Sequence, residues 1–94
     1  MVIGVCTIDL DIPMSASLKD KRQVIKSVTA RLRNEFNVSV AEVERHDAWQ
    51  TTVLAVVTVS RDRDYAHGLL MRVAQWLENT RLDCVLVDYQ IEFV

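Results

Sequence analysis

Glycine and proline are scarce in this chain, with two glycines and one proline among 94 residues. Flexible linkers and disordered tails are rich in these residues, so the sequence leaves little room for either. It also contains no glycine-rich phosphate loop and no G-x-G-x-x-G pattern, which excludes the common nucleotide-binding motifs. A chain of this length predicts a single domain over residues 1–94 with one modest core.

Cysteine and histidine are equally sparse and do not form metal-ligand spacings. Cys6 lies far from Cys84, and His46 lies far from His67. A structural metal site needs three or four converging ligands, so we expect no metal and no cofactor. We expect two free thiols in a reduced, cytoplasmic protein rather than a disulfide. Cys6 also alternates with predicted core positions, where a thiol is usually inert, so we do not expect an enzyme.

The chain lacks a strong charge of either sign and any long apolar run. Its net charge of −2 argues against bulk attraction to nucleic acid but leaves room for a local basic face. The longest apolar run, Val53 to Val57, is far too short to span a bilayer, and no signal segment opens the chain. We therefore expect a soluble cytoplasmic protein that does not contact membranes.

Alternating apolar residues predict a first strand over residues 2–10. Its one face carries Val2, Gly4, Cys6, Ile8 and Leu10, and its other face carries Ile3, Val5 and Thr7. After Pro13, Ser17 suits a helix N-cap, with Asp20 in the positive first turn. A helix should follow over residues 18–35, because its apolar residues recur at helical spacing. They are Leu18, Ile25, Val28, Leu32 and Phe36.

The second half of the chain repeats this alternation of strand and helix. We expect a strand over residues 38–45 with a bulge between Val40 and Val43, and a β-branched strand over residues 51–60. A second helix should start at residues 62–64 and end at residues 79–81. Its predicted inner face comprises Tyr65, Leu69, Leu70, Val73, Trp76 and Leu77. A last strand over residues 83–93 should point Val85, Val87, Tyr89, Ile91 and Phe93 inward.

This order of elements is strand, helix, strand, strand, helix, strand. Two right-handed crossovers joined by a hairpin predict an α+β, ferredoxin-like two-layer sandwich. The expected sheet is antiparallel, with four strands in the order 4-1-3-2 and both helices on one face.

The face of the sheet without helices should be mostly polar, but the two central strands are too apolar for that. An exposed apolar patch usually marks an interface, so we predict one at Ile3, Val5, Leu54 and Val56. The sequence leaves open which set of side chains in residues 51–60 faces the helices. It also leaves open whether a second copy or another protein covers the patch, or whether loops and long side chains do.

Lys19, Arg22, Lys26 and Arg33 fall within about 60° on the first predicted helix. They could follow the phosphates of an RNA, or they could form a solvated face whose stems pack over the edge of the core. Trp49 lies in the predicted hairpin loop. It could stack on a base or close the end of the core. Base stacking on the sheet itself is not expected, because the two central strands carry no aromatic residue.

Three segments resemble a known family. They are Ser17-Leu18-Lys19-Asp20-Lys21-Arg22, Phe36-Asn37-Val38-Ser39-Val40-Ala41-Glu42-Val43 and Asp47-Ala48-Trp49-Gln50. Through them the chain resembles, over essentially its whole length, the YlxP-like family of small bacterial proteins of unknown function. The resemblance implies a small ferredoxin-like cytoplasmic protein and offers no catalytic residues. Family members are often encoded near genes for translation initiation and ribosome maturation, which is an association and not a mechanism.

Two hypotheses follow for the function. The first is a non-enzymatic accessory protein that contacts RNA or the ribosome through Lys19, Lys21, Arg22, Lys26, Arg33 and Trp49. The second is a protein-interaction or homodimerisation module that uses the open face of the sheet. A small-ligand sensor is weaker, because the turn at residues 11–16 has no glycine-rich backbone, and no small-molecule substrate is indicated.

Overall fold

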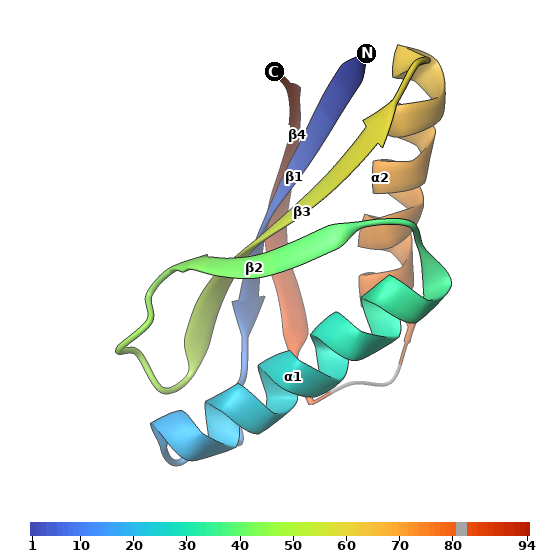
Figure 1. Ribbon diagram of the computed structural model, residues 1–94. Helices are drawn as coiled ribbons and strands as arrows, with labels where there is room; N and C mark the ends of the chain where they lie inside the picture. The colour runs from blue at the N-terminus through green and yellow to red at the C-terminus, as the bar shows by residue number, and fades with distance from the viewer. Residues whose placement is uncertain (81–82) are drawn as a thin grey trace.

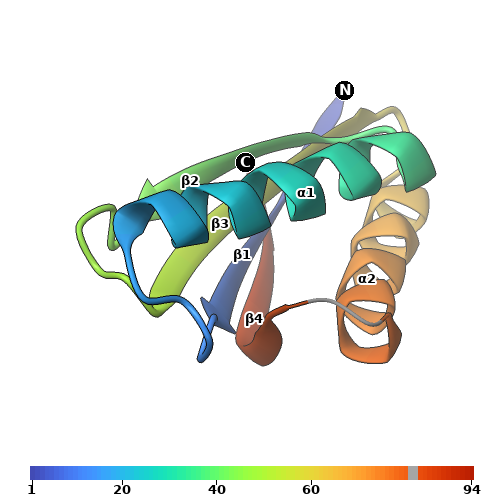
Figure 2. The same ribbon diagram turned by 90° about the horizontal axis from the view of Figure 1, so that it is seen from below.

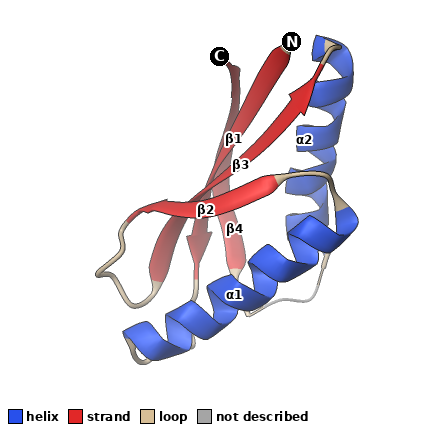
Figure 3. Ribbon diagram, in the orientation of Figure 1, coloured by secondary structure: helices blue, strands red, loops and turns tan. Residues whose placement is uncertain are grey.

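A four-stranded sheet with two helices on one face makes up the computed structural model, which describes residues 1–80 and 83–94 (Figure 1). In chain order the elements are β1 (Val2–Asp11), α1 (Leu18–Glu35), β2 (Ser39–Glu44), β3 (Thr51–Ser60), α2 (Arg63–Asn79) and β4 (Val85–Phe93). All neighbouring strands are antiparallel, in the order β2-β3-β1-β4. The predicted ferredoxin-like fold and its strand order are therefore confirmed (Figure 3).

The alternation of β1 decides which side of the sheet is covered. Gly4, Cys6, Ile8 and Leu10 are all buried, as the sequence pattern predicts. In β3, Val56 pairs with Cys6 and Leu54 pairs with Ile8, so these residues share the buried side. Val57 and Val59 of β3 take the opposite side, which the sequence alone left undecided.

The first helix starts where the sequence predicts and covers the β2 side of the sheet. The Ser17 hydroxyl accepts a hydrogen bond from the Asp20 amide at 3.0 Å, and the Asp20 carboxylate accepts one from the Ala16 amide at 3.0 Å. These two bonds satisfy amides that a helix start would otherwise leave unpaired. Val28 and Leu32 are buried in the same core cluster as Cys6 and Leu54.

The second helix covers the middle of the sheet and diverges from α1 (Figure 2). Its buried residues are Ala66, Leu69, Leu70, Val73, Ala74 and Leu77. The predicted inward position of Tyr65 is wrong, since this side chain is 58% exposed in the first turn. Trp76 is half-buried against the core, with the Arg31 guanidinium 5.5 Å from its ring centroid. Arg81, predicted to end this helix, lies outside the described residues. None of the described helices is long and apolar enough to cross a membrane.

Two register shifts break the strand alternation. One lies between Glu42 and Glu44 of β2, where the sequence predicts a bulge, so that expectation is confirmed. The other lies in β4, where Asp88 pairs with Asp9 but Leu86 pairs with Leu10. An extra residue in one strand turns the following side chains to the other face. The predicted inward positions of Val85 and Val87 are therefore wrong, and both side chains are exposed.

β1 and α2 pack closely together at Gly4. A Cβ atom there would lie 2.9 Å from Leu70 Cδ1 and 3.4 Å from Phe93 Cε1. We expect Gly4→Val to lower the free energy of unfolding by about 1–3 kcal/mol, because the packed core must shift to admit the side chain. Thr7→Val, on the open side of the same strand, should change it by less than about 0.5 kcal/mol. Urea unfolding measures both free energies of unfolding. Equal decreases in the two variants would contradict the close packing of Gly4 against Leu70 and Phe93.

Candidate functional site

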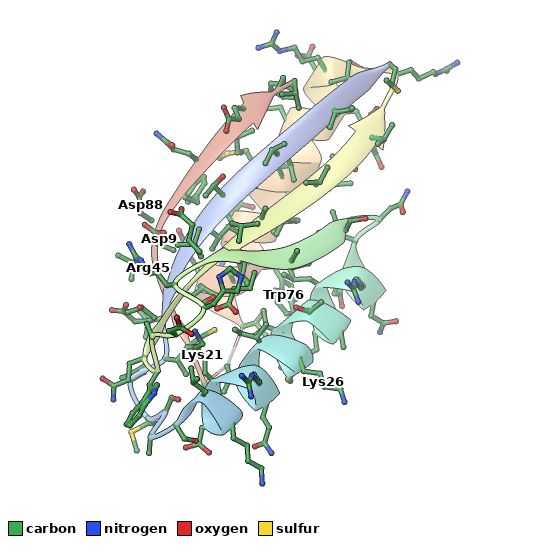
Figure 4. The ribbon with its side chains drawn as sticks, turned by 60° about the vertical axis from the view of Figure 1, so that its left-hand side comes forward. Asp9, Lys21, Lys26, Arg45, Trp76 and Asp88 are labelled. Atoms are coloured by element: carbon green, nitrogen blue, oxygen red, sulfur yellow. The ribbon has the colours of Figure 1, made fainter. Side chains whose placement is uncertain are left out.

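Four of the predicted phosphate contacts form one exposed row on α1. Lys19, Arg22, Lys26 and Arg33 are all exposed, and we call them the basic row. Figure 4 shows Lys26 extending outward from the helix. The row borders edge strand β2, because Arg33 Nη2 donates to the Val40 carbonyl at 3.2 Å. This bond fixes one end of the row and also covers part of an open sheet edge.

Lys21 does not belong to this row. Its side chain is only 1% exposed, and its ammonium forms an ion pair with Glu42 at an Nζ–Oε2 distance of 3.0 Å. It also donates to the carbonyls of Arg45 at 2.7 Å, and of His46 and Thr51 at 3.3 Å each. The expectation that Lys21 contacts a phosphate is therefore wrong, because its protons are already directed at protein oxygens.

The buried ammonium ties α1 to the loop between β2 and β3 (Figure 4). Arg45, the first residue of that loop, adopts a left-handed backbone conformation with φ of 61°. Such a conformation is unfavourable for a side chain of this size and persists where the surroundings over-determine it. The bond from Lys21 to the Arg45 carbonyl supplies part of that constraint. The loop is thus held from the side of the helix.

Glu42 completes the same cluster. Burial alone would raise the pKa of the Glu42 carboxyl, but hydrogen bonds from the Thr52 hydroxyl and Lys21, together with the Lys21 charge, outweigh it. The net pKa lies below its ordinary value of 4.5. The carboxylate therefore stays ionised and paired with Lys21 at neutral pH.

The sequence did contain a signal for the buried lysine. Lys21 precedes Ile25 by four residues and Val28 by seven, which is the spacing of the apolar stripe of α1. It also falls outside the 60° sector that holds the basic row. A lysine within an apolar stripe predicts a buried partner, and Glu42 is that partner.

The β2–β3 loop, which carries Trp49, lies at the same end of the molecule as the start of α1 (Figure 1, Figure 2). The Trp49 side chain is 56% exposed, so it does not close the core. Its neighbour Gln50 donates from Nε2 to the carbonyls of Pro13 at 3.2 Å and Ser15 at 3.1 Å. The Gln50 carbonyl accepts from the Ile12 amide at 2.7 Å. These bonds join the loop of Trp49 to the connection that leads into α1.

The open face of the sheet is the second candidate surface. Ile3 and Val5 lie on it, as predicted, and Val57 and Val59 join them from β3. The predicted positions of Leu54 and Val56 on this face are wrong, because both are fully buried beneath the helices. The physical reason is their pairing with Ile8 and Cys6, which face the helices.

The cysteines do not offer a reactive centre. Cys6 is fully buried, and burial raises the pKa of its thiol to about 11. Burial, followed by the negative charge of Asp83, also raises the pKa of Cys84. Both thiols are free and protonated at neutral pH, so they are poor nucleophiles. Within residues 1–80 and 83–94, no group of three His, Cys, Asp or Glu residues could hold a metal ion.

A hollow of about 360 Å³ lies beside the turn at residues 12–16. Ile12, Met14 and Val24 contribute apolar atoms to its lining. Of its two acidic lining residues, Asp20 already accepts from the Ala16 amide, and Asp83 is exposed. In the described part of the chain, no buried side-chain polar atom lacks a hydrogen-bond partner.

Comparison with known protein sequences identifies the family of this chain. Residues 3–91 match the family described as "Protein of unknown function (DUF503)". The chain belongs to the DUF503 family. It is 35% identical over 78 residues to the uncharacterized protein YlxP of Bacillus subtilis (strain 168), a stretch that covers 83% of this chain and 85% of that protein. The sequence resemblance is thus confirmed, and neither description assigns an activity.

The buried ion pair predicts a large difference between two lysines of α1. Lys21→Met should lower the free energy of unfolding by about 3 kcal/mol, because it removes the ion pair to the partly buried Glu42 and the lysine's hydrogen bonds to three carbonyls. Lys26→Met, on the exposed side of the same helix, should change it by less than about 0.5 kcal/mol. Chemical denaturation measures both. Equal effects would show that the Lys21 cluster does not hold the helix in place.

The lowered pKa of Glu42 predicts a specific loss of stability in acid. A carboxyl whose pKa is lower in the folded state stabilises the protein above its unfolded pKa, and this contribution disappears as pH falls through the folded pKa. The difference in free energy of unfolding between wild type and Glu42→Gln should therefore be larger at pH 7 than at pH 3. The control variant is Glu44→Gln, which makes the same substitution at an exposed glutamate of the same strand. Denaturant unfolding curves at both pH values measure these differences. The same pH dependence in Glu42→Gln and Glu44→Gln would contradict the role of the Glu42–Lys21 pair.

Proposed function

We propose that this protein is a non-enzymatic accessory protein that binds RNA, with the ribosome as its setting, through the basic row of α1 and Trp49. The observation that carries the proposal is an exposed indole at the end of α1 where the basic row starts, on a loop that Gln50 joins by hydrogen bonds to the connection before the helix. Cations supply sequence-independent attraction to phosphates, and an exposed aromatic ring supplies a surface for an unpaired base.

The length of the basic row suits a nucleic-acid backbone. Lys19 and Arg33 are 14 residues apart, which corresponds to about 21 Å along a helix. Arg22 and Lys26 lie between them on the same side. A row of this length can meet several successive phosphates of one strand.

The acidic residues of α1 do not interrupt the row. At about 100° per residue, Asp20 and Glu35 fall outside the 60° sector that carries the cations. Asp20 is also held by the Ala16 amide at the helix start. The attraction of the row therefore survives although the protein as a whole carries a net charge of −2.

Trp49 adds a contact of a different kind. Exposed Asp47 lies two residues before it, so phosphates are expected to follow the helix rather than cross the loop. Stacking of one base on an aromatic side chain is worth about 1–3 kcal/mol and depends weakly on salt. The backbone contacts and the stacking contact can thus be separated by experiment.

The first experiment is co-sedimentation with purified ribosomal subunits across a salt series. Wild type should bind with an affinity that falls steeply with salt, and Arg22→Glu/Lys26→Glu should bind weakly with a log–log slope shallower by about two units. The matched control is Arg63→Glu/Arg72→Glu on α2, which makes the same change in net charge on another surface. Circular dichroism checks that both variants fold.

Two results would contradict the proposal. One is wild-type protein that stays in the supernatant at every salt concentration. The other is an equal loss of binding in the α1 and α2 double variants, which would mean that net charge rather than the basic row controls association.

Trp49→Ala should weaken RNA binding by about 5- to 150-fold, the equivalent of one stacked base, and leave the salt slope unchanged. Tryptophan fluorescence follows the contact directly in a Trp76→Phe background, where Trp49 is the remaining indole. We expect single-stranded RNA to quench this emission. Binding without any change in Trp49 fluorescence would remove the stacking contact from the proposal.

A further inference from the structure

The edge of the sheet at β2 has carbonyl groups that the chain itself occupies. The Val40 carbonyl accepts a hydrogen bond from Arg33 Nη2 at 3.2 Å, and the Glu42 carbonyl forms one with His46 Nε2 at 3.3 Å. An open edge strand is a template for pairing with another strand, and side chains that occupy its backbone groups oppose such pairing. The β2 edge is therefore a poor site for a further strand.

The edge at β4 turns its backbone groups outward at every second residue. The Val94 amide donates to the Ile3 carbonyl at 3.0 Å, which makes these two residues a hydrogen-bonded pair of the antiparallel ladder. Such pairs alternate along the ladder with pairs that are not hydrogen-bonded. Ile91 and Phe93 therefore direct their amides and carbonyls away from β1.

The chain closes only one end of this edge. Figure 4 shows β4 as an outermost strand, with no described element beyond it. Asp88 closes the outward amide of Tyr89, because its Oδ1 accepts from that amide at 2.9 Å. Within residues 1–80 and 83–94, no side chain hydrogen-bonds to the outward groups of Ile91 and Phe93. Residues 89–93 can therefore pair with a further strand of about five residues.

The side chains of this stretch differ between the two sides of the sheet. On the helix side Ile91 and Phe93 are half-buried, and the Arg63 guanidinium lies 4.5 Å from the centroid of the Phe93 ring. On the other side Gln90 and Glu92 are exposed. Directly paired residues of neighbouring strands point to the same side. A strand that pairs here must therefore be apolar towards the helices and polar on the open side.

The open side of the sheet is acidic along this edge. Asp88 and Glu92 lie on it in β4, and Asp9 and Asp11 extend the acidic region onto β1. Figure 4 shows Asp9 and Asp88 side by side, with the cation of Arg45 near them. The one ion pair among the described residues lies elsewhere, at the buried ammonium of α1. One cation against four acids leaves this side of the edge negative.

We infer that β4 binds an extended segment of another protein, which joins the sheet as a fifth strand and alternates basic with apolar residues. Its apolar side chains lie beside Ile91 and Phe93, and its lysines or arginines lie beside Asp88 and Glu92. Backbone hydrogen bonds to a sheet edge supply affinity, and alternate side chains supply specificity. This binding is independent of the basic row, which lies on the helix layer.

A second copy of this chain does not suit the same edge. A two-fold axis that pairs two β4 strands antiparallel places the open sides of both sheets on one side. Asp88 and Glu92 would then gather four carboxylates there, two from each copy. Like charges on neighbouring strands are destabilising. RNA is disfavoured for the same reason, because its phosphates would meet these carboxylates.

Fluorescence anisotropy with a labelled peptide of six alternating lysine and valine residues tests the binding. The full chain should bind it with a dissociation constant below about 1 mM. Glu92→Lys should raise that constant at least about fivefold, because it sets like charges on neighbouring strands. Glu35→Lys is the matched control, which makes the same charge change at an exposed residue at the end of α1. Urea unfolding checks that both variants keep the fold.

The backbone contacts are tested separately from the charges. The same peptide with a methyl group on every backbone nitrogen keeps its charges but has no backbone donor, so it should bind at least about tenfold more weakly. Amide hydrogen exchange locates the contact. In the free protein Ile91 and Phe93 should exchange faster than Gln90 and Glu92, and the unmethylated peptide should slow them.

Each contrary result overturns the inference in a different way. Absence of binding at about 1 mM peptide removes the site. Equal binding of the methylated peptide, or equal weakening in Glu35→Lys, leaves charge alone as the cause of association. Slow exchange of Ile91 and Phe93 in the free protein, together with a dimer in sedimentation equilibrium, assigns the edge to a second copy. Arg22→Glu/Lys26→Glu should bind the peptide like wild type, so failure of the RNA proposal and failure of this one are distinguishable.

Discussion

The position of α1 relative to β2 and the β2–β3 loop depends on one buried ammonium group, that of Lys21. Lys21 joins α1, β2 and the β2–β3 loop through Glu42 and three backbone carbonyls. Burying an ion pair costs desolvation free energy, and an apolar pair of similar volume is often as stable. The charged pair instead adds geometric specificity, because each proton of the ammonium group needs an acceptor oxygen at a defined position. We infer that Lys21 sets where the loop stands relative to the helix, and thereby where Trp49 stands relative to the basic row.

Most of the fold could be predicted from local patterns. The period-two alternation of residues 2–10 and the Ser17 cap are determined by neighbours in the chain, and both are confirmed. The first bulge could be predicted because Val40 and Val43 break the alternation in the sequence itself. The second was harder to locate, because residues 87–93 alternate regularly and only the apolar run Val85-Leu86-Val87 departs from the pattern, while the shift itself arises from pairing with β1. Register is a property of two strands, so one strand alone does not reveal it.

The candidate surfaces were harder to predict than the fold, and the errors have one cause. A strand that is apolar on both sides, like residues 53–57, contains no information on which side is covered. The predicted positions of Leu54 and Val56 are therefore on the wrong face. The residue type of Lys21 suggests a solvated side chain, although its helical position is that of Val28. Both questions are decided by tertiary partners: Ile8 and Cys6 in one case, and Glu42 in the other.

The net charge of the chain conceals two regions of opposite sign. Acidic residues gather at one end of the open sheet face, where Asp9 pairs with Asp88, whereas the cations of the basic row lie on α1 in the other layer. At physiological ionic strength exposed charges influence one another over about 8 Å, a shorter distance than the thickness of two packed layers. An acidic protein can therefore present a basic surface to one partner while its sheet meets another.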